Sequence, residues 1–337
     1  MLRVSLILGL VVAALTALTT ALPAEASEPL RAGIIGCDTS HVIQFTKIFN
    51  NPEAEGDLAK ITVVAAFPGG SQDIPSSRDR VGKFTDQLRE MGVERVDSID
   101  ALLRRVDVVL LESSDGRVRL DQIKPVLAAG KPVFMDKPVA ASLADVVEIF
   151  QLAVQHNVPC FSSSAVRFGP ALQSLRKSDE VGNVLGCSAF SPCLLEPHHP
   201  DLFWYGVHGV ELLFTTMGTG CQTVANTRTD DTDLAAGAWQ DGRVGTFRGL
   251  RTGKHDYGAL VYGSNGNVYH HGFGGYKPLV EQIARFFLTG TPPVSAEVTI
   301  EIYAFMEAAH ESRRRGGVPV TIDSVLTKAR ATVKDRH

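Results

Sequence analysis

The stretch from Val106 to Ala141 constrains the fold most, because it reads as strand, helix and strand within about 30 residues. Residues 108–111 are an apolar run with the length and composition of a strand buried on both faces. An apolar stripe at helical spacing follows and ends at Gly130, and residues 133–135 form a second short apolar run. A βαβ unit of this kind predicts a parallel sheet.

Polar side chains follow both strands of this unit. Glu112, Ser113 and Ser114 come after the first strand, and Asp136 and Lys137 come after the second. In open parallel sheets, ligands bind beyond the carboxyl ends of the strands. We therefore expect these residues at one rim of the sheet and a ligand site at that rim.

Length and charge limit the functional class. The chain has 337 residues, enough for two domains, and 44% of them are hydrophobic. Its formal net charge is −4 and it has no basic run, which argues against nucleic acid as the main partner.

The first 26 residues predict a signal peptide rather than part of the fold. Arg3 supplies the positive start, residues 4–22 are mostly apolar, and Ala24-Glu25-Ala26 is a small-residue cleavage site. We expect export to the periplasm or beyond; a membrane anchor is the alternative, because the apolar run approaches spanning length.

The five cysteines fit no zinc motif, and their odd number leaves at least one unpaired within the chain. Cys187 and Cys193 are close enough in sequence to pair. Cys37 and Cys160 lie in apolar, strand-like runs, where a buried packing cysteine is the default.

The turn after the first expected strand, 30–35, is where a dinucleotide fold places G-x-G-x-x-G. Only Gly36 is present, since Asp38 stands at the second glycine position and His41 at the third. A carboxylate there adds bulk and a like charge where a pyrophosphate must approach. Asp38 as an N-cap, with Thr39 in the first turn, is the structural alternative. Taken alone, this turn argues against ordinary NAD binding.

The second expected strand, 61–67, ends without the Asp or Glu that binds a ribose. The chain continues as Pro68-Gly69-Gly70-Ser71, with Arg78 and Arg80 nearby. Ser71 and these arginines predict a phosphate site of the NADP type, and a solvated turn is an equally good interpretation.

The pattern changes after the strand expected at 158–161. Longer strands separated by Gly, Asn and Asp turns predict a second domain with a mostly antiparallel sheet. The expected domains are a Rossmann-like domain at 28–160 and a second domain at 161–337. The strands expected in the second domain are 184–190, 221–229, 235–239, 244–250, 259–263 and 267–271, and the helices are 202–217, 276–288 and 296–315.

Two segments resemble a known family. The sequence Ala129-Gly-Lys-Pro-Val-Phe-Met-Asp-Lys-Pro138 is similar to the A-G-K-x-V-x-x-E-K-P segment of the glucose–fructose oxidoreductase, inositol dehydrogenase and MocA family (Gfo/Idh/MocA). Gly206-Val207-His208 resembles part of that family's D-x-G-x-H-x-x-D helix. Tyr276-Lys277-Pro278 and the two helices after it resemble the family's C-terminal elements.

The resemblance implies a nicotinamide-binding first domain and a second domain that carries a sugar pocket and often mediates oligomers. By the same match, Lys137 and His208 are the expected acid–base residues; a salt-bridged lysine and a core imidazole are the structural alternatives. The expected cofactor contacts are Gly36, Asp38, Thr39, Ser71, Glu112, Ser113, Asp136 and Lys137, and the expected substrate contacts are Arg167, His199, Tyr205 and Glu211.

The chain also departs from the family pattern. Trp204 stands where the family has its catalytic Asp, and Glu211 replaces the second Asp. Ser114-Asp115-Gly116 and Arg119 occupy the family's T-P-N-x-x-H positions. Export adds a further difficulty, because a protein threaded unfolded across a membrane must capture any dinucleotide afterwards.

Three functions follow from these observations. The first is an exported sugar oxidoreductase with a tightly held NAD(P). The second is a non-redox carbohydrate lyase, epimerase or glycosidase that uses His41, Lys137 and His208 for acid–base chemistry, with Arg167 holding a sugar carboxylate. The third is a carbohydrate-binding protein that has lost the chemistry.

A metal site is the less favoured interpretation of the sequence. Ligand-type side chains do gather within 14 residues, but without the tight spacing of a metal motif. These side chains are His198, His199, Asp201, His208 and Glu211.

Overall fold

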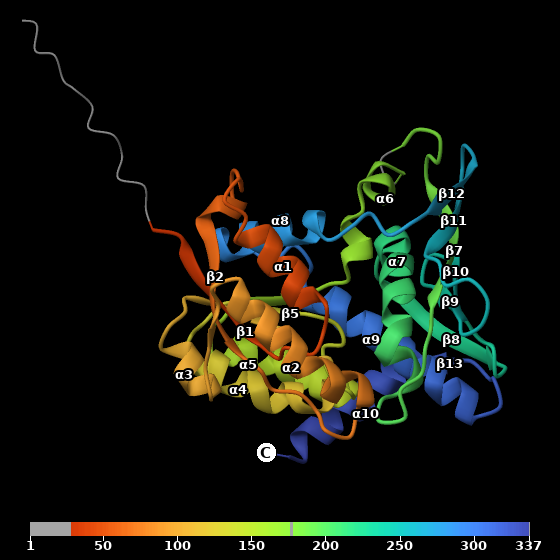
Figure 1. Cartoon of the computed structure of the whole chain (residues 1–337). Coiled ribbons are helices and arrows are strands. Elements are labelled where there is room, and N and C mark those ends of the chain that lie inside the picture. Colours follow the sequence, from red (N-terminus) through yellow and green to blue (C-terminus); the bar gives the residue numbers. More distant parts are fainter. Residues whose placement is uncertain (1–27, 176–177, 337) are drawn as a thin grey trace, which may run out of the picture.

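The computed structural model describes residues 28–175 and 178–336, and these form two domains that lie side by side (Figure 1). The first domain is built on a six-stranded parallel sheet in the order β3-β2-β1-β4-β5-β6, so the predicted parallel sheet is confirmed. Its strands are β1 (Leu30–Ile35), β2 (Ile61–Phe67), β3 (Glu94–Arg95), β4 (Val108–Leu111), β5 (Val133–Met135) and β6 (Cys160–Ser162).

Helices cover both faces of this sheet, which is why its central strands are apolar throughout. One face carries α1 and α2, and the other carries α3, α4 and α5. The helices are α1 (His41–Phe49), α2 (Pro75–Glu90), α3 (Ile99–Leu103), α4 (Arg119–Ala128) and α5 (Leu143–Gln155). The strand order reverses between β1 and β4, and a crevice at such a reversal is the usual ligand site of an open α/β sheet.

The second domain contains a seven-stranded sheet in the order β12-β11-β7-β10-β9-β8-β13. Only β7 and β10 pair in parallel, so the predicted mostly antiparallel sheet is also confirmed. Its strands are β7 (Val184–Pro192), β8 (Cys221–Arg228), β9 (Thr232–Trp239), β10 (Val244–Leu250), β11 (Gly258–Gly263), β12 (Asn267–His271) and β13 (Val320–Thr321). A 3-10 turn at Ala165–Phe168 and the short helix α6 (Pro170–Leu175) link the two sheets.

One helix, α7 (Val207–Met217), packs directly on the second sheet against β7 and β10. All its residues are buried, as expected for a helix that is apolar around most of its circumference. Gly209 allows the close approach, since a Cβ there would lie 2.3 Å from the Phe247 ring. A π-helical turn, Leu202–Gly206, precedes α7, so the helix expected at 202–217 is two segments.

The last helices return to the first domain (Figure 1). Helix α8 (Lys277–Thr289) packs against α1, while α9 (Ala296–Arg314) and α10 (Ile322–Lys334) pack against α5. The sequence interpretation did not include α10. Strand β6 belongs to the first sheet, so the domain boundary expected at 160/161 falls inside this strand.

No helix among residues 28–175 and 178–336 is long and apolar enough to cross a membrane. The predicted signal peptide, 1–26, lies outside the described residues. All five cysteines are buried and unpaired, including Cys187 and Cys193. Burial raises the pKa of each thiol, to about 12 for Cys37 and Cys160, so these groups are inert packing residues.

Candidate functional site

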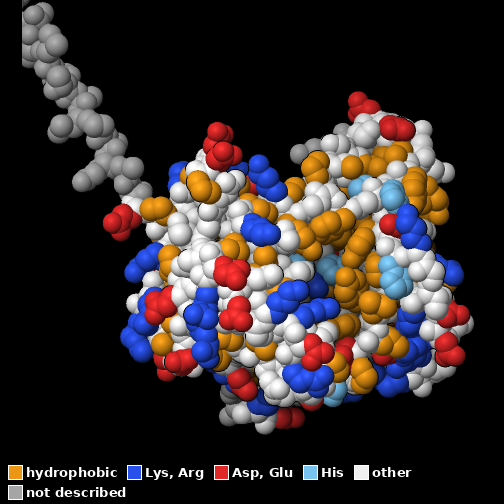
Figure 2. All heavy atoms as spheres, in the orientation of Figure 1, with side chains coloured by type: hydrophobic (Ala, Val, Ile, Leu, Met, Phe, Trp, Pro, Cys, Tyr) orange, Lys and Arg blue, Asp and Glu red, His pale blue; other side chains and the backbone are white. Residues whose placement is uncertain are grey.

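A cavity of about 250 Å³ lies between the domains, at the carboxyl rim of the parallel sheet. Figure 2 shows the molecule hollowed between its two parts, with hydrophobic side chains gathered beside basic and histidine side chains. The cavity is lined from both domains, and its chemistry-bearing residues are His41, Lys137, Tyr205, His208, Tyr257 and Tyr276. Of the rim residues predicted from the sequence, Lys137 lines this cavity, whereas Glu112, Ser113, Ser114 and Asp136 do not.

Lys137 and His208, the predicted acid–base pair, both line this cavity. Lys137 follows β5, and its Nζ lies 5.4 Å from the centroid of the Tyr205 ring, within the range of a cation–π contact. The Tyr205 ring in turn packs edge-on against His208, with centroids 5.0 Å apart. The Tyr205 ring therefore contacts both the Lys137 ammonium group and the His208 imidazole.

His208 is held neutral at ordinary pH. Burial, and secondarily the positive charges of Lys137 and His41, hold the pKa of His208 well below its usual value. Its Nδ1 lies 2.7 Å from Ser164 Oγ, and no described residue hydrogen-bonds to Nε2. Because the ring lines the cavity, Nε2 is available to a ligand.

His41, the first residue of α1, turns toward the end of β5. Its Nδ1 lies 2.7 Å from Asp136 Oδ2, and its ring packs against Tyr276 with centroids 4.9 Å apart. Burial raises the pKa of Asp136, but the charge and hydrogen bond of His41 and the charge of Lys137 lower it more, so the net shift is well downward.

Glu112 lies fully buried beside Asp136. Burial first, and then the neighbouring carboxylate of Asp136, raise the pKa of Glu112 well above its ordinary value. One carboxyl of the pair is therefore held ionised and the other is pushed toward its neutral form, which is typical of functional carboxyl pairs.

Arg119 is also fully buried, but its hydrogen bonds go to backbone carbonyl groups. Its guanidinium donates to the carbonyl oxygens of Leu111, Ser113 and Asp136, at 3.0 Å from Leu111 O and 2.5 Å from Asp136 O. This side chain joins the ends of β4 and β5 and fixes the rim. Sequence comparison marked Arg119 only as a departure from the family motif.

Asp38 is the centre of the cofactor turn, and it does not cap α1. Its carboxylate accepts hydrogen bonds from Ser77 Oγ at 2.6 Å, from Ser114 N at 2.9 Å and from Ser114 Oγ at 2.8 Å. The N-cap of α1 is Ser40, without a side-chain cap. The N-cap alternative for Asp38 is therefore wrong: its carboxylate joins the β1 turn to the loop after β4.

Gly36 permits this close approach of the two loops. It has a φ of +89°, and a Cβ at this position would lie 2.2 Å from Ser113 Oγ. The one glycine of the dinucleotide pattern that the chain retains thus packs against a neighbouring loop.

A second carboxylate, Asp115, closes the same side of the rim. It accepts from Ser71 Oγ at 2.5 Å and from the guanidinium of Arg117, and it lies 3.3 Å from His199 Nε2. His199 also accepts from Gly116 N at 2.8 Å and packs against Trp204. We call this set the closed network: Asp38, Ser71, Ser77, Ser114, Asp115, Arg117 and His199.

Ser71 and His199, which the sequence predicts as ligand contacts, belong to the closed network. Ser71 was expected to hold a cofactor phosphate, but its hydroxyl is bound to the Asp115 carboxylate. Arg78 pairs with Asp79, and of the two arginines only Arg80 reaches the cavity. His199 was expected to contact substrate, but its side chain lies within the closed network.

A dinucleotide in the ordinary Rossmann position would meet two buried carboxylates in this structure. The pyrophosphate would cross from the β1 turn past the β4 loop, where the buried carboxylates of Asp38 and Asp115 bind loop residues. The space beside the turn is a second cavity of only about 70 Å³. Both cavities are smaller than the roughly 300–1,000 Å³ typical of sites for drug-sized ligands.

Two further predicted substrate residues satisfy each other. Arg167 Nε forms an ion pair with Glu211 Oε1, which also accepts from Ser163 Oγ at 2.9 Å. Neither residue lines the cavity, so a role for Arg167 in holding a sugar carboxylate is not supported. Of the four predicted substrate contacts, Tyr205 alone lines the cavity.

The metal-type residues noted at 198–211 do not converge. Asp201 pairs with Arg228 and Arg313, and His198 pairs with Glu196. In the described part of the chain, the group of three such side chains with ligand atoms close together is His41, Glu112 and Asp136.

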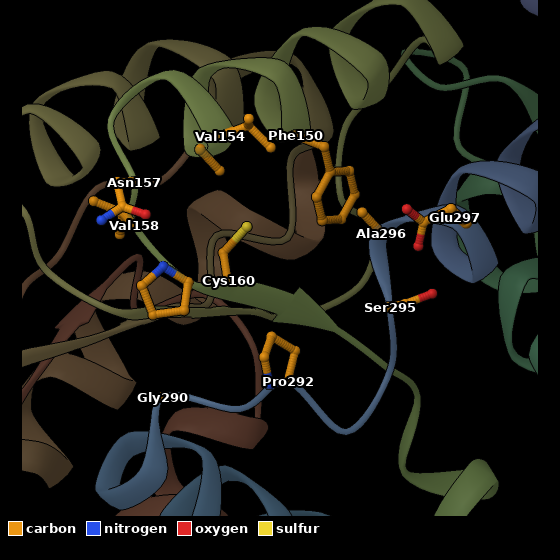
Figure 3. A pocket seen from close by; sticks show the side chains of 12 residues that line it. Phe150, Val154, Asn157, Val158, Cys160, Gly290, Pro292, Ser295, Ala296 and Glu297 are labelled. Atoms are coloured by element: carbon orange, nitrogen blue, oxygen red, sulfur yellow. The ribbon is translucent and has the colours of Figure 1, made fainter.

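A larger hollow lies elsewhere on the molecule. It measures about 640 Å³ and lies at the β6 edge, between α5 and the connection from α8 to α9 (Figure 3). Val154, Phe150 and Pro292 dominate its walls, and it has no histidine, lysine or arginine. The smaller cavity is therefore the candidate for chemistry.

Comparisons with known proteins agree with this architecture. Residues 30–164 match the family model GFO_IDH_MocA, described as an oxidoreductase family with an NAD-binding Rossmann fold. No curated protein matches the chain.

Solved structures match over nearly the whole chain. The structure of scyllo-inositol dehydrogenase from Lactobacillus casei with bound NAD(H) and scyllo-inositol is 16% identical, with a TM-score of 0.70, and covers 88% of this chain and 100% of that one. Myo-inositol 2-dehydrogenase from Lactobacillus plantarum is 15% identical, with a TM-score of 0.72, over 87% and 99%. GenD2 from gentamicin A biosynthesis, in complex with NAD, is 16% identical, with a TM-score of 0.70, over 87% and 96%. At these identities the likeness establishes the fold.

Proposed function

The first domain of this chain belongs to the Gfo/Idh/MocA oxidoreductase family, and from this premise we propose that the protein is an enzyme that moves protons on a sugar or another polyol. The observation that carries the proposal is the meeting of Lys137, His208 and Tyr205 in one cavity of about 250 Å³. That volume suits a compact ligand, and a structural relative is known with scyllo-inositol bound.

In this proposal His208 is the base. Its neutral imidazole accepts a proton through Nε2, while Ser164 holds Nδ1 and fixes the ring. Lys137 supplies a fixed positive charge for the oxygen on which negative charge develops. Both groups can act on the same ligand because they line the same cavity.

The reaction class that these roles support is a lyase or epimerase. His208 removes a proton from a carbon next to a carbonyl group, and the electron pair moves onto the carbonyl oxygen beside Lys137. When the electron pair returns to the same carbon with a proton from the other face, the product is an epimer. When it instead expels an oxygen from the next carbon, the proton leaves with that oxygen and a double bond forms.

The tyrosines favour a carbohydrate ligand. Tyr205, Tyr257 and Tyr276 offer aromatic faces with polar tips around the cavity. Such rings pack against the C–H faces of a sugar ring, and their hydroxyls are hydrogen-bond partners for its hydroxyl groups.

An exported sugar oxidoreductase with a tightly held NAD(P) is the second candidate. The match to an NAD-binding family model and the NAD(H) in related structures favour it. It requires the closed network to open around the dinucleotide, so the two candidates differ in a measurable way.

Deuterium uptake separates the candidates. In D₂O, epimerisation places deuterium on a substrate carbon, whereas elimination gives an unsaturated product, and mass spectrometry detects both across a panel of keto-sugars, uronates and inositols. We expect one of these products with the purified protein and no NAD(P) released on denaturation. Stoichiometric NAD(P), with dehydrogenation of the panel and no carbon-bound deuterium, would establish the redox candidate instead.

Variants test the assigned residues. His208→Gln should slow exchange by about 10²–10⁴-fold, the usual contribution of a general base. Lys137→Met should slow it comparably, whereas His156→Gln, an exposed histidine after α5, is the matched control and should not. Full activity of both cavity variants would overturn the assignment.

Export by a cleaved signal peptide is also part of the proposal, based on the pattern at 1–26. Expression in a bacterial host, followed by fractionation and mass spectrometry of the N-terminus, tests it. We expect a mature chain in the periplasmic fraction that begins near Ser27.

A further inference from the structure

Three side chains from three separate elements meet beneath the cavity. His41 is the first residue of α1, Glu112 directly follows β4, and Asp136 directly follows β5. Each offers one ligand atom, and these atoms all lie within 4.8 Å of one another. We call His41, Glu112 and Asp136 the rim triad. It lies beside the reversal of strand order, where this kind of sheet binds its ligands.

The rim triad contains buried oxygens without partners. Neither carboxylate oxygen of Glu112 receives a hydrogen bond from any described residue, and Asp136 Oδ1 receives none either. The exposed fractions are 0% for Glu112 and 1% for Asp136. Because a buried polar group without a hydrogen-bond partner destabilises a fold, three such oxygens in one cluster indicate a ligand.

The neighbouring positive groups do not supply the missing contacts. Arg119 is next to both carboxylates, but four of its five N–H donors are taken up by three backbone carbonyl oxygens. Lys137 faces the cavity and the Tyr205 ring. A proton shared by Glu112 and Asp136 would satisfy part of the set and leave a Glu112 oxygen without a donor.

We propose that the rim triad binds one divalent metal ion. Ligand atoms about 2.1 Å from a metal lie roughly 3–3.4 Å apart, so modest side-chain rotations within the observed 4.8 Å would complete the set. One imidazole nitrogen and two carboxylates suit Mn²⁺ or Zn²⁺ better than the soft metals that thiolates select. Two carboxylates balance the charge of the ion, which matters because Arg119 and Lys137 are already positive.

The rim triad lies beside the cavity, so an ion bound there would be close to a ligand in the cavity. His41 and Lys137 line the cavity, so an ion held beside His41 would lie next to the ligand space. Three protein ligands leave coordination positions open, as in catalytic rather than structural sites. A substrate oxygen bound there would be polarised. The binding site itself is inferred from side chains alone and does not depend on the proposed reaction.

Metal binding can be measured without turnover. The full-length mature protein is stripped with EDTA, dialysed against Mn²⁺ or Zn²⁺, and desalted. We expect one ion per chain by elemental mass spectrometry and a rise in melting temperature with either metal. Electron spin-echo measurements on the Mn²⁺ form should show coupling to one imidazole nitrogen. Absence of retained metal and of any metal-dependent melting shift would overturn the inference, as would bound Mn²⁺ without a nitrogen signal.

Variants test which residues bind the ion. Glu112→Gln and His41→Gln should each weaken metal affinity by at least about a hundredfold, the upper end of losses from outer-shell changes. Asp233→Asn is the matched control, because Asp233 is buried but already bound to Arg251 and Asn226. It should retain the ion. Equal metal retention in the wild type and the Glu112→Gln variant would refute the assigned ligands. A wild-type protein that binds the metal but shows neither deuterium exchange nor elimination would contradict the proposed reaction and leave the metal site standing.

Discussion

The closed network and the rim triad lie on the same rim and treat their carboxylates in opposite ways. In the closed network, Asp38 and Asp115 are surrounded by hydroxyl, amide and guanidinium donors. In the rim triad, three carboxylate oxygens have no donor among the described residues. This difference shows that a buried charge can serve structure or function. The presence or absence of hydrogen-bond donors around the charge distinguishes the two.

The largest effect should come from breaking the closed network. Asp115→Ala removes the acceptor of Ser71 and Arg117 and leaves the buried Ser71 hydroxyl without its partner. We expect a loss of about 3 kcal/mol in the free energy of unfolding, measured by urea denaturation. Asp121→Ala, on the exposed side of α4, is the control and should change little. A small effect of Asp115→Ala would mean that the closed network is not structural.

The stability of the protein at acid pH should depend on the same carboxylate, Asp115. Burial raises the pKa of Asp115, but hydrogen bonds from His199, Arg117 and Ser71 lower it more, so the net pKa is far below its usual value. A carboxyl with a depressed pKa stabilises the fold above its unfolded value of about 3.9, and this stability is lost as the pH falls. Between about pH 5 and pH 2 the wild type should therefore lose stability more steeply than Asp115→Asn. Parallel urea midpoints across this range would contradict the expectation.

A smaller effect should follow from reopening the cofactor turn. Asp38→Gly removes a carboxylate from the pyrophosphate position and should raise NADH affinity by about tenfold, equivalent to roughly 1.4 kcal/mol. Titration with NADH, followed by fluorescence, measures it. Asp38→Asn keeps the size and removes the charge, so it separates bulk from repulsion. Unchanged affinity in both variants would show that Asp38 is not what excludes the dinucleotide.

The smallest change in the free energy of unfolding should come from a substitution in the rim triad when no metal is bound. Glu112→Gln replaces a carboxyl that has no donor with a neutral amide of the same shape, which adds N–H donors beside the Asp136 carboxylate. In EDTA the free energy of unfolding should stay within about 1 kcal/mol of the wild type. A loss as large as that of Asp115→Ala would make the two carboxylate clusters alike and remove the contrast between them.

The sequence predicts the framework of the site well. The strand at 108–111, the strand at 133–135 and the rim after them follow from apolar runs and a helical stripe, because burial on both faces leaves few alternatives. The placement of Lys137 and His208 in one cavity follows from two motifs on different domains.

The sequence does not predict which polar groups bind each other. Asp38 reaches Ser114, and His199 reaches Asp115, across 76 and 84 positions of the chain. Such contacts depend on the turn geometry of loops, which leaves no periodic signal. The signal that could have found the rim triad is that Glu112 and Asp136 both come directly after central strands, while His41 opens the helix beside them.

The return of α8 to the first domain has a consequence for biosynthesis. Leu279, Ile283 and Phe286 complete the apolar cluster that also contains Val42 and Leu110. The helix layer that α1 and α2 form on the first sheet is therefore incomplete until the ribosome has synthesised α8, which ends at Thr289. A fragment ending near residue 164 would expose that surface, so the N-terminal half should need the rest of the chain, or a chaperone, to stay soluble.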